Sequence, residues 1–273
     1  MHGLGNDFVF IEDKDGMTKD FSDLAISMCA PHTGIGADGL IVIVPSDIAD
    51  VRMRIINADG SEAEMCGNGI RCFAKYVYDY GIIKKTEFTV ETLAGVMKPK
   101  VTVGADGKVR LVTINMGKPF IERSQIPMVG PKGAVVNEPL EVDGKTYAIT
   151  SLLLGVPHTM VYVDDVDAID LPTLGPKFEH HKAFPNRTNM NFIERVDDHT
   201  IKVHTWERGA GATLACGTGS CACAVGSYLN GFTGRSVDVQ LYLGTLHVDY
   251  DETDGNVYMT GPAAVTFTGE WLG

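Results

Sequence analysis

The stretch CGNG at residues 66–69 recurs as CGTG at residues 216–219, an offset of 150 residues. Downstream of these two stretches the same offset relates further identical residues: Ala74 and Ala224, Tyr78 and Tyr228, and Gly81 and Gly231. Near the start of the chain, residues 7–13 resemble residues 159–165 at an offset of 152. Self-similarity along the whole chain is the signature of a duplicated unit. We therefore predict two related halves that meet near residues 117–119.

Each copy of the repeated stretch precedes a segment with apolar residues at helical spacing, so a helix is expected after Cys66 and another after Cys216. Gly81 and Gly231 are expected to end these helices. Short β-branched runs predict strands at 8–12, 40–44, 51–57, 88–93, 96–103, 109–115, 237–243, 245–250, 256–259 and 264–268. Because each helix is apolar around most of its circumference, the strands of each half are expected to wrap around it. The predicted fold is α+β, with two pseudo-symmetric domains, each a mixed or antiparallel β-barrel around one central helix.

A cysteine at the start of a helix is placed for chemistry. The first helical turn has unpaired N–H groups and a partial positive charge, so the pKa values of Cys66 and Cys216 are expected to fall. Glycine after each cysteine lets an anionic ligand approach the N–H groups closely. Such a site could also be a buried cysteine beside a packing glycine, but its repetition in both halves favours the chemical interpretation. The other cysteines are expected in the core: Cys29, Cys72, Cys221 and Cys223.

Two such halves, facing each other across a pseudo-twofold axis, would place two sulfur atoms on opposite sides of one α-carbon. One thiolate would remove the α-proton and one thiol would deliver a proton to the other face, which is what a racemase requires.

Composition restricts the class of protein. The chain has 273 residues and a formal net charge of −12, which argues against nucleic acid and anionic membrane surfaces as partners. Residues 1–10 lack the features of a secretory signal, and no apolar run approaches the ~20 residues of a membrane span. A cytoplasmic protein is expected. The six cysteines lack the paired spacing of a zinc site, so no metal is expected.

Several segments resemble the diaminopimelate epimerase family of cofactor-independent amino-acid epimerases. They are HGLGNDF (2–8), GIGADG (34–39), NADGSEAEMCGNGIRC (57–72), PH (157–158), TNMNF (188–192) and WERGAGATLACGTGSCA (206–222). The resemblance implies an N-terminal half of residues 1–116 plus 263–273 and a C-terminal half of residues 117–262, with the active site in the cleft between them. It also implies that the last strand, from about Pro262, returns to the first domain.

The resemblance implies PLP-independent epimerisation of LL-2,6-diaminopimelate to meso-diaminopimelate, in lysine and peptidoglycan-precursor biosynthesis. No cofactor is implied, and the family tends to form homodimers. Cys66 and Cys216 would be the acid/base pair, and His158 and Glu207 would assist proton transfer beside them. The residues implied to bind substrate are Asn6, Asn57, Gly67, Asn68, Asn189, Glu207, Arg208, Gly217 and Thr218.

Alternatives remain open at this stage. Val156, Gly39 and Ala212 stand where many family members carry Asn, Gln and Glu, and the chain starts at the Met of MHGLGND, without the usual first-strand residues. A racemase of another amino acid, such as histidine, is therefore an alternative. A redox or metal-binding module using the cysteine pair is another. A pyridoxal-phosphate racemase would need a lysine beside a phosphate loop, and we find no such arrangement.

Individual residues also have structural interpretations. Asn57 precedes Ala-Asp-Gly and could only form a turn. Arg208 could be a solvated loop charge, and a lone histidine such as His158 is more often structural than catalytic.

Overall fold

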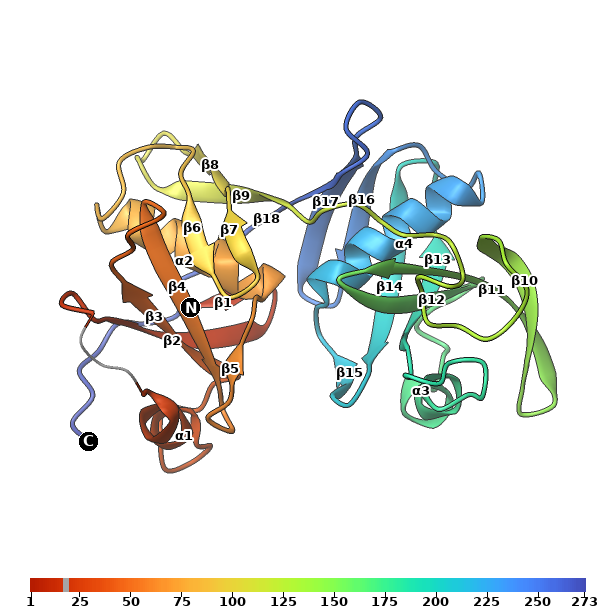
Figure 1. Cartoon of the computed structure of the whole chain (residues 1–273), viewed down its shortest axis with the longest axis horizontal. Helices are drawn as coiled ribbons and strands as arrows, with labels where there is room; N and C mark the ends of the chain where they lie inside the picture. The colour runs from red at the N-terminus through yellow and green to blue at the C-terminus, as the bar shows by residue number, and fades with distance from the viewer. Residues whose placement is uncertain (17–19) are drawn as a thin grey trace. The chain divides into compact units, whose positions relative to one another are not determined.

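The computed structural model describes residues 1–16 and 20–273 and divides the chain into two sheet-rich units (Figure 1). Unit 1 consists of Met1–Ile114 together with Thr260–Gly273, and unit 2 consists of Asn115–Met259.

Unit 1 is built on a seven-stranded sheet with two helices and a hairpin that belongs to the second sheet. The sheet has the order β1-β2-β3-β4-β6-β7, with β5 paired to β4. Its strands are β1 (His2–Gly3), β2 (Asn6–Glu12), β3 (Gly39–Val44), β4 (Val51–Asn57), β5 (Glu62–Ala63), β6 (Val90–Thr92) and β7 (Gly95–Met97). The helices are α1 (Ser22–Cys29) and α2 (Gly67–Asp79), and the hairpin is β8 (Lys100–Val103) and β9 (Val109–Asn115).

Unit 2 holds most of an eleven-stranded sheet, whose strand order is β10-β11-β12-β13-β14-β16-β17-β18-β9-β8, with β15 paired to β14. Its strands are β10 (Val135–Val142), β11 (Lys145–Leu154), β12 (Val156–Val163), β13 (Asn189–Arg195), β14 (Thr200–Glu207), β15 (Gly211–Thr213), β16 (Ser236–Leu241), β17 (Gly244–Tyr250) and β18 (Val257–Gly261). The helices are α3 (Leu171–Glu179) and α4 (Gly217–Leu229). The chain passes from unit 2 back to unit 1 within β18.

Strand pairing repeats in the same order in the two units. In unit 1, β2–β3 is parallel, β3–β4 antiparallel and β4–β6 parallel. In unit 2, β12–β13 is parallel, β13–β14 antiparallel and β14–β16 parallel. The short strands β5 and β15 pair antiparallel with β4 and β14 respectively. The predicted α+β fold with two related halves is confirmed.

One long helix lies at the centre of each unit. α4 packs against β11, β12, β13, β14, β16 and β17, and α2 packs against β1, β2, β4 and β8 (Figure 1). Nearly all of α4 from Gly217 to Ser227 is buried, as its apolar circumference predicted. Gly81 and Gly231 follow the two helices with φ values of 76° and 70°, a conformation that favours glycine. The predicted central helices and their ends are therefore confirmed.

Each half has one long helix, as expected, and each unit also has a shorter helix, α1 or α3, that was not predicted. Each connects a parallel strand pair, β2 to β3 and β12 to β13, and parallel strands need such a crossover. α1 has only eight residues, and α3 contains Pro172 and Pro176, so neither shows a long helical periodicity.

Two predicted strands also need correction. The expected strand at 96–103 is two strands, β7 and β8, separated at Lys98 and Pro99. The expected strand at 264–268 is not formed, and only Ala264 makes an isolated bridge, to His2. Phe267 is 62% exposed, so this stretch lacks the buried face that holds a strand in a sheet.

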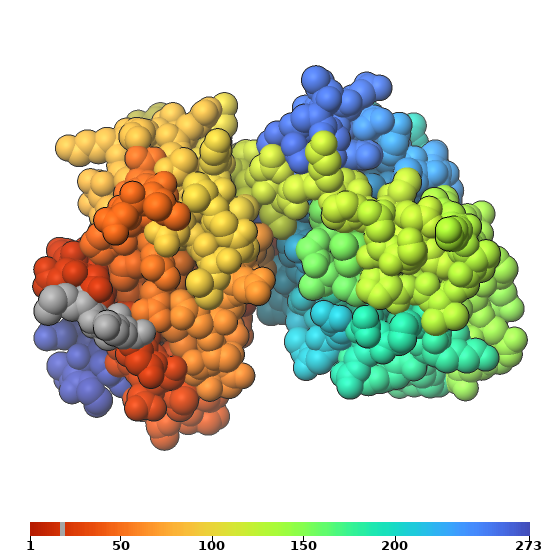
Figure 2. All heavy atoms as spheres, viewed as in Figure 1, coloured from red at the N-terminus to blue at the C-terminus, as the bar shows by residue number. Residues whose placement is uncertain are grey.

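The C-terminal residues attach to unit 1 through a few specific contacts. The hydroxyls of Thr113 and Thr260 are 2.7 Å apart, and Arg71 Nε donates to Pro262 O at 3.3 Å. Ala264 and His2 exchange two backbone hydrogen bonds of 2.9 and 3.0 Å. The last residues, in dark blue, lie on the surface of unit 1 (Figure 2). None of the helices in the described ranges combines the length and apolar character that a membrane-spanning helix needs.

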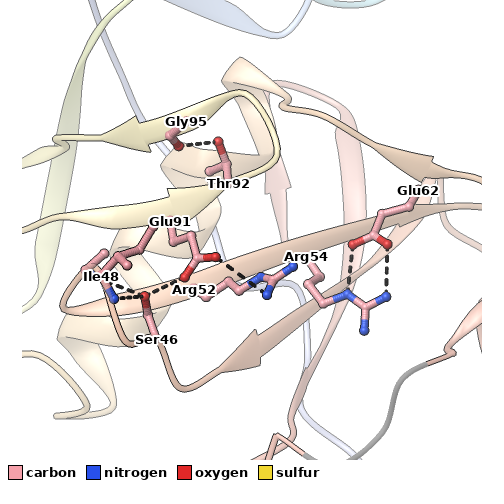
Figure 3. Close-up of polar contacts among 9 residues, drawn as sticks. Ser46, Ile48, Arg52, Arg54, Glu62, Glu91, Thr92 and Gly95 are labelled. Carbon is pink, nitrogen blue, oxygen red and sulfur yellow. Dashed lines mark hydrogen bonds and ion pairs between the residues drawn. The ribbon is translucent and has the colours of Figure 1, made fainter.

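Ion pairs link β4 to its neighbours β5 and β6 (Figure 3). Arg54 makes two hydrogen bonds to Glu62 on β5, with Nε–Oε1 at 2.8 Å and Nη2–Oε2 at 2.9 Å. Arg52 pairs with Glu91 on β6 at 3.5 Å. The Arg54–Glu62 pair closes the β4–β5 hairpin, whose turn begins at Asn57, and two parallel N–H···O bonds fix this geometry better than one.

Candidate active site

In unit 1, the N-terminus of α2 brings three of the predicted site residues together. Cys66 is the N-cap, with extended backbone angles, and Gly69 N donates to its sulfur at 3.4 Å. Cys66 Sγ donates to Asn6 Oδ1 at 3.4 Å, and Asn68 Nδ2 donates to the same oxygen at 3.2 Å. The Asn6 oxygen therefore holds the thiol at the helix start.

Asp38 fixes the orientation of the Asn6 amide. Asn6 Nδ2 donates to Asp38 Oδ2 at 2.6 Å, and Asp7 N donates to the same oxygen at 3.0 Å. Since only the amide nitrogen can donate to a carboxylate, the amide oxygen must face Cys66. Asp38 lies in the GIGADG motif but was not among the residues predicted to form the site.

In unit 2, the N-terminus of α4 carries the second thiol. Cys216 is the N-cap residue and is 5% exposed. Its Sγ donates to Glu207 Oε2 at 3.0 Å and lies 3.6 Å from Thr218 Oγ1. Thr213 Oγ1 donates to the other Glu207 oxygen at 2.6 Å, which holds the carboxylate in place.

The expectation that the helix start lowers the pKa was wrong for Cys216. Burial raises the pKa of this thiol well above its ordinary value, and the negative charge and hydrogen bond of Glu207 raise it further. A partial helix charge is weaker than the loss of water around the sulfur combined with a carboxylate in direct contact. Cys216 therefore rests as a thiol beside a proton acceptor.

His158 is fully buried and connects to the same helix start. Its Nε2 lies 3.1 Å from Thr218 Oγ1, and its Nδ1 lies 3.3 Å from Asn191 Nδ2. Asn191 Nδ2 also donates to Thr159 O at 3.2 Å, and Asn191 Oδ1 accepts from Thr205 Oγ1 at 3.0 Å. The Asn191 nitrogen is thus a donor, so a neutral His158 accepts at Nδ1 and carries its proton on Nε2.

Burial lowers the pKa of His158 to about 3, and the nearby Arg208 charge contributes. His158 is consequently a neutral hydrogen-bond donor to Thr218 at neutral pH. The role of Asn191 was missed at the sequence level, although the residue belongs to the quoted TNMNF motif.

The buried neutral state of His158 predicts a loss of stability in acid. Because the pKa is lower in the folded chain than the ordinary 6.5, the stabilisation is present above pH 6.5 and is lost as the pH falls toward 3. We expect the wild type to lose about 3 kcal/mol more unfolding free energy than His158→Gln between pH 6.5 and about pH 4. Urea denaturation at each pH measures this. Replacing the exposed His199 by Gln should leave the wild-type pH dependence, and an equal loss in the His158 variant would contradict the prediction.

Asn189 and Arg208 form a linked pair in unit 2. Asn189 Oδ1 accepts from Arg208 N at 2.7 Å, and Asn189 Nδ2 donates to Pro157 O at 3.2 Å. Arg208 is exposed, and its Nη1 donates to Asn186 O at 2.8 Å. Asn189 therefore holds the backbone of the loop that carries the guanidinium.

Asn57 does not join the group formed by Asn6, Cys66 and Asn68 within unit 1. It ends β4, and its Nδ2 donates to Ser61 Oγ at 2.9 Å within the β4–β5 turn.

Close packing explains one helix-start glycine. A Cβ atom on Gly219 would lie 2.9 Å from Asn191 Oδ1 and 3.2 Å from Cys216 Sγ. Any side chain there would displace either the sulfur or the amide that fixes His158.

The remaining four cysteines are buried, as predicted: Cys29, Cys72, Cys221 and Cys223. None of the six cysteines forms a disulfide. Burial raises the pKa of Cys72 to about 12 and the pKa of Cys29 to about 11. Across the described ranges, no group of three His, Cys, Asp or Glu side chains is arranged to hold a metal ion.

Comparison with known proteins gives consistent matches. The family described as diaminopimelate epimerase matches residues 1–121 and 150–266. The diaminopimelate epimerase of Pelotomaculum thermopropionicum is 52% identical over 272 residues, covering 99% of this chain and 96% of that protein. The diaminopimelate epimerase of Heliobacterium modesticaldum is 50% identical over 273 residues, covering 99% and 97%.

Solved structures of more distant proteins share the fold. A PhzF-family phenazine biosynthesis protein from Bacillus anthracis superimposes with a TM-score of 0.65 at 17% identity, covering 96% of this chain and 92% of that one. A hydroxyproline epimerase from Agrobacterium vitis gives a TM-score of 0.61 at 16% identity, covering 87% and 76%. At these identities the likeness concerns the two-unit fold and not the substrate.

Proposed function

Because this chain belongs to the diaminopimelate epimerase family, we propose that it interconverts LL- and meso-diaminopimelate with Cys66 and Cys216 as its two proton-transferring groups. The observation that carries the proposal is the repeated helix start. Each unit places one cysteine at the N-cap of its central helix, and each sulfur contacts a polar side chain of its own unit, Asn6 or Glu207. Two such thiols are what a reaction that inverts one carbon centre needs.

In the proposed reaction, the N-terminal half, residues 1–116 plus 263–273, contributes Cys66, and the C-terminal half, residues 117–262, contributes Cys216. One sulfur, as a thiolate, takes the α-proton of the substrate, and its S–H bond forms as the C–H bond breaks. The other thiol gives its proton to the opposite face of the carbanion. The product has the inverted configuration, and the two sulfurs have exchanged protonation states, so no proton is gained or lost overall.

Glu207 supports this scheme as the local proton acceptor of Cys216, because its Oε2 is 3.0 Å from the sulfur. The neutral His158 donates to Thr218 Oγ1, which leaves the Thr218 hydroxyl hydrogen free to point toward Cys216 Sγ at 3.6 Å. A hydrogen bond from this hydroxyl stabilises the thiolate form when it appears.

The reacting carboxylate is assigned to the two helix starts. α2 begins at Gly67 and α4 at Gly217, and the N–H groups of a first helical turn have no partner inside the helix. Asn68 and Thr218 belong to these first turns. Developing negative charge on the carboxylate in the transition state is stabilised there. Asn6, Asn57, Asn189, Glu207 and Arg208 complete the proposed substrate contacts, with the Arg208 guanidinium suited to the distal carboxylate.

The test is a coupled assay with LL-diaminopimelate under reducing conditions, with no cofactor added. We expect conversion to the meso form, together with deuterium incorporation at the α-carbon when the reaction runs in heavy water. Amino acids with a single carboxylate, histidine among them, should react at least tenfold more slowly because they lack the group that Arg208 binds. Faster turnover of histidine would reassign the substrate while keeping the chemistry.

The same proposal includes the cellular setting. We place the chain in the cytoplasm, where reducing conditions keep both thiols free, and in lysine and peptidoglycan-precursor biosynthesis. We propose a homodimer, so light scattering in solution should give twice the 29.4 kDa of one chain.

A further inference from the structure

A buried carboxylate outside the proposed chemistry contacts the segment that carries Glu207 and Arg208. Glu179, the last residue of α3, is 3% exposed. Its Oε2 accepts from Trp206 Nε1 at 2.7 Å, and its Oε1 accepts from Gly209 N at 3.2 Å. Burying an ionised carboxylate is costly unless it is fully bonded, so this position calls for a specific explanation.

The two bonds hold the two ends of one short segment. Trp206 precedes Glu207 at the end of β14, and Gly209 follows Arg208 in the turn toward β15. A single carboxylate thus fixes the residue before and the residue after the pair that is proposed to act on the proton and the distal carboxylate.

The packing of α3 reinforces this connection. A Cβ atom on Gly175 would lie 2.4 Å from Trp206 Cγ, so the helix backbone rests directly on the indole. Arg187 Nη1 is 3.3 Å from Glu179 Oε1, which partly neutralises the carboxylate. The hydrogen bonds from Trp206 and Gly209 and the nearby His180 and Arg187 outweigh burial, and the pKa of Glu179 lies below its ordinary value.

We propose that Glu179 is a positioning residue for the reaction, acting through the Trp206–Gly209 segment to keep the Glu207 carboxylate against Cys216. The proposal rests on the function assigned above. It explains why α3 ends in an acid: two oxygens accept from two donors that point at them from different residues. A glutamine would offer one oxygen and one NH2 group, so either the indole or the Gly209 amide would face another donor.

The kinetic test compares Glu179→Gln and Glu179→Ala in the full-length chain. We expect kcat/KM for diaminopimelate to fall about 10-fold in the first variant and about 100-fold in the second, the effect of displacing a reacting group by up to ~1 Å. In a Glu207→Gln background, Glu179→Gln should lower kcat/KM by a smaller factor, because the Glu207 carboxylate that Glu179 positions is already absent. The control is Glu194→Gln, which removes a carboxylate of the same unit that accepts from Val166 N, and should stay within threefold of wild type.

Fluorescence of Trp206 tests the environment of the Trp206–Gly209 segment without relying on activity. The chain has two tryptophans, so Trp271→Phe leaves Trp206 as the sole reporter. In that background, both Glu179 variants should shift the Trp206 emission to longer wavelength, whereas Glu194→Gln should not. Circular dichroism establishes that each variant is folded, and Glu179→Gln remains available if Glu179→Ala does not fold.

Unchanged Trp206 emission in both folded variants would overturn the inference, and so would a kcat/KM within threefold of wild type. The inference would also fail if Glu179→Gln lowered kcat/KM by the same factor in the Glu207→Gln background as in the wild type. If the parent protein shows no epimerase activity, the proposed function fails instead, and the emission test still decides whether Glu179 holds the segment.

Discussion

Replacing either Cys66 or Cys216 by alanine should lower kcat/KM for diaminopimelate epimerisation by about 10³-fold, within the range that one positioned acid or base contributes. Each sulfur is proposed to serve one face of the α-carbon, so neither can substitute for the other. The measurement is the coupled assay under reducing conditions, together with α-proton exchange in heavy water. Serine replacements should be similarly poor, because a hydroxyl is a weak base at neutral pH.

The double variant separates a pair that acts as a unit from two independent contributions. If both sulfurs act in one proton transfer sequence, Cys66→Ala combined with Cys216→Ala should be no worse than either single variant. The controls are Cys29→Ala in unit 1 and Cys223→Ala in unit 2, which remove buried thiols away from the helix starts. These controls should lose stability but keep kcat/KM within threefold. Activity that survives in both single variants would contradict the two-thiol proposal.

Glu207→Gln should make the Cys216 thiol easier to alkylate but should lower the rate of epimerisation. The Glu207 carboxylate raises the pKa of the Cys216 thiol through its charge and its hydrogen bond, so the variant should form the Cys216 thiolate at lower pH. Alkylation of Cys216 by iodoacetamide, followed by mass spectrometry across pH, should therefore begin at lower pH than in the wild type. Epimerisation should nevertheless fall by about 10²-fold, because the group that exchanges the thiol proton is lost.

This prediction is specific because the reactivity of Cys216 toward iodoacetamide should rise while the epimerisation activity falls. A variant that merely disturbs the fold would lower activity and raise the alkylation rate of several buried cysteines together. Glu122→Gln removes a carboxylate of the same unit that accepts from Gly133 N at 2.8 Å, and it should change neither property. An alkylation profile of Cys216 that is unchanged or moved to higher pH in Glu207→Gln would show that the carboxylate does not govern this thiol.

Several features of the fold could be predicted from the sequence because they are local or repeated. The two helix starts, the glycines that end the central helices and the burial of the four other cysteines follow from short patterns. The crossover helices α1 and α3 could not be predicted in this way. Their shortness and the prolines of α3 hide the helical period, and their presence follows from parallel strand pairing, which is a long-range property.

By itself, the sequence determined that the chain is a duplication with one cysteine at the start of each central helix. The reason is that two copies of the same local structure keep the same spacing of their cysteine and glycine residues. Only the tertiary structure decided the environment of those cysteines. Asp38, Asn191 and Glu179 lie far along the chain from the groups that they orient, and their roles depend on which atoms the fold brings within hydrogen-bonding distance. The pKa of Cys216 is raised for the same reason, because burial and a neighbouring charge depend on the packing around the sulfur and no short motif specifies them.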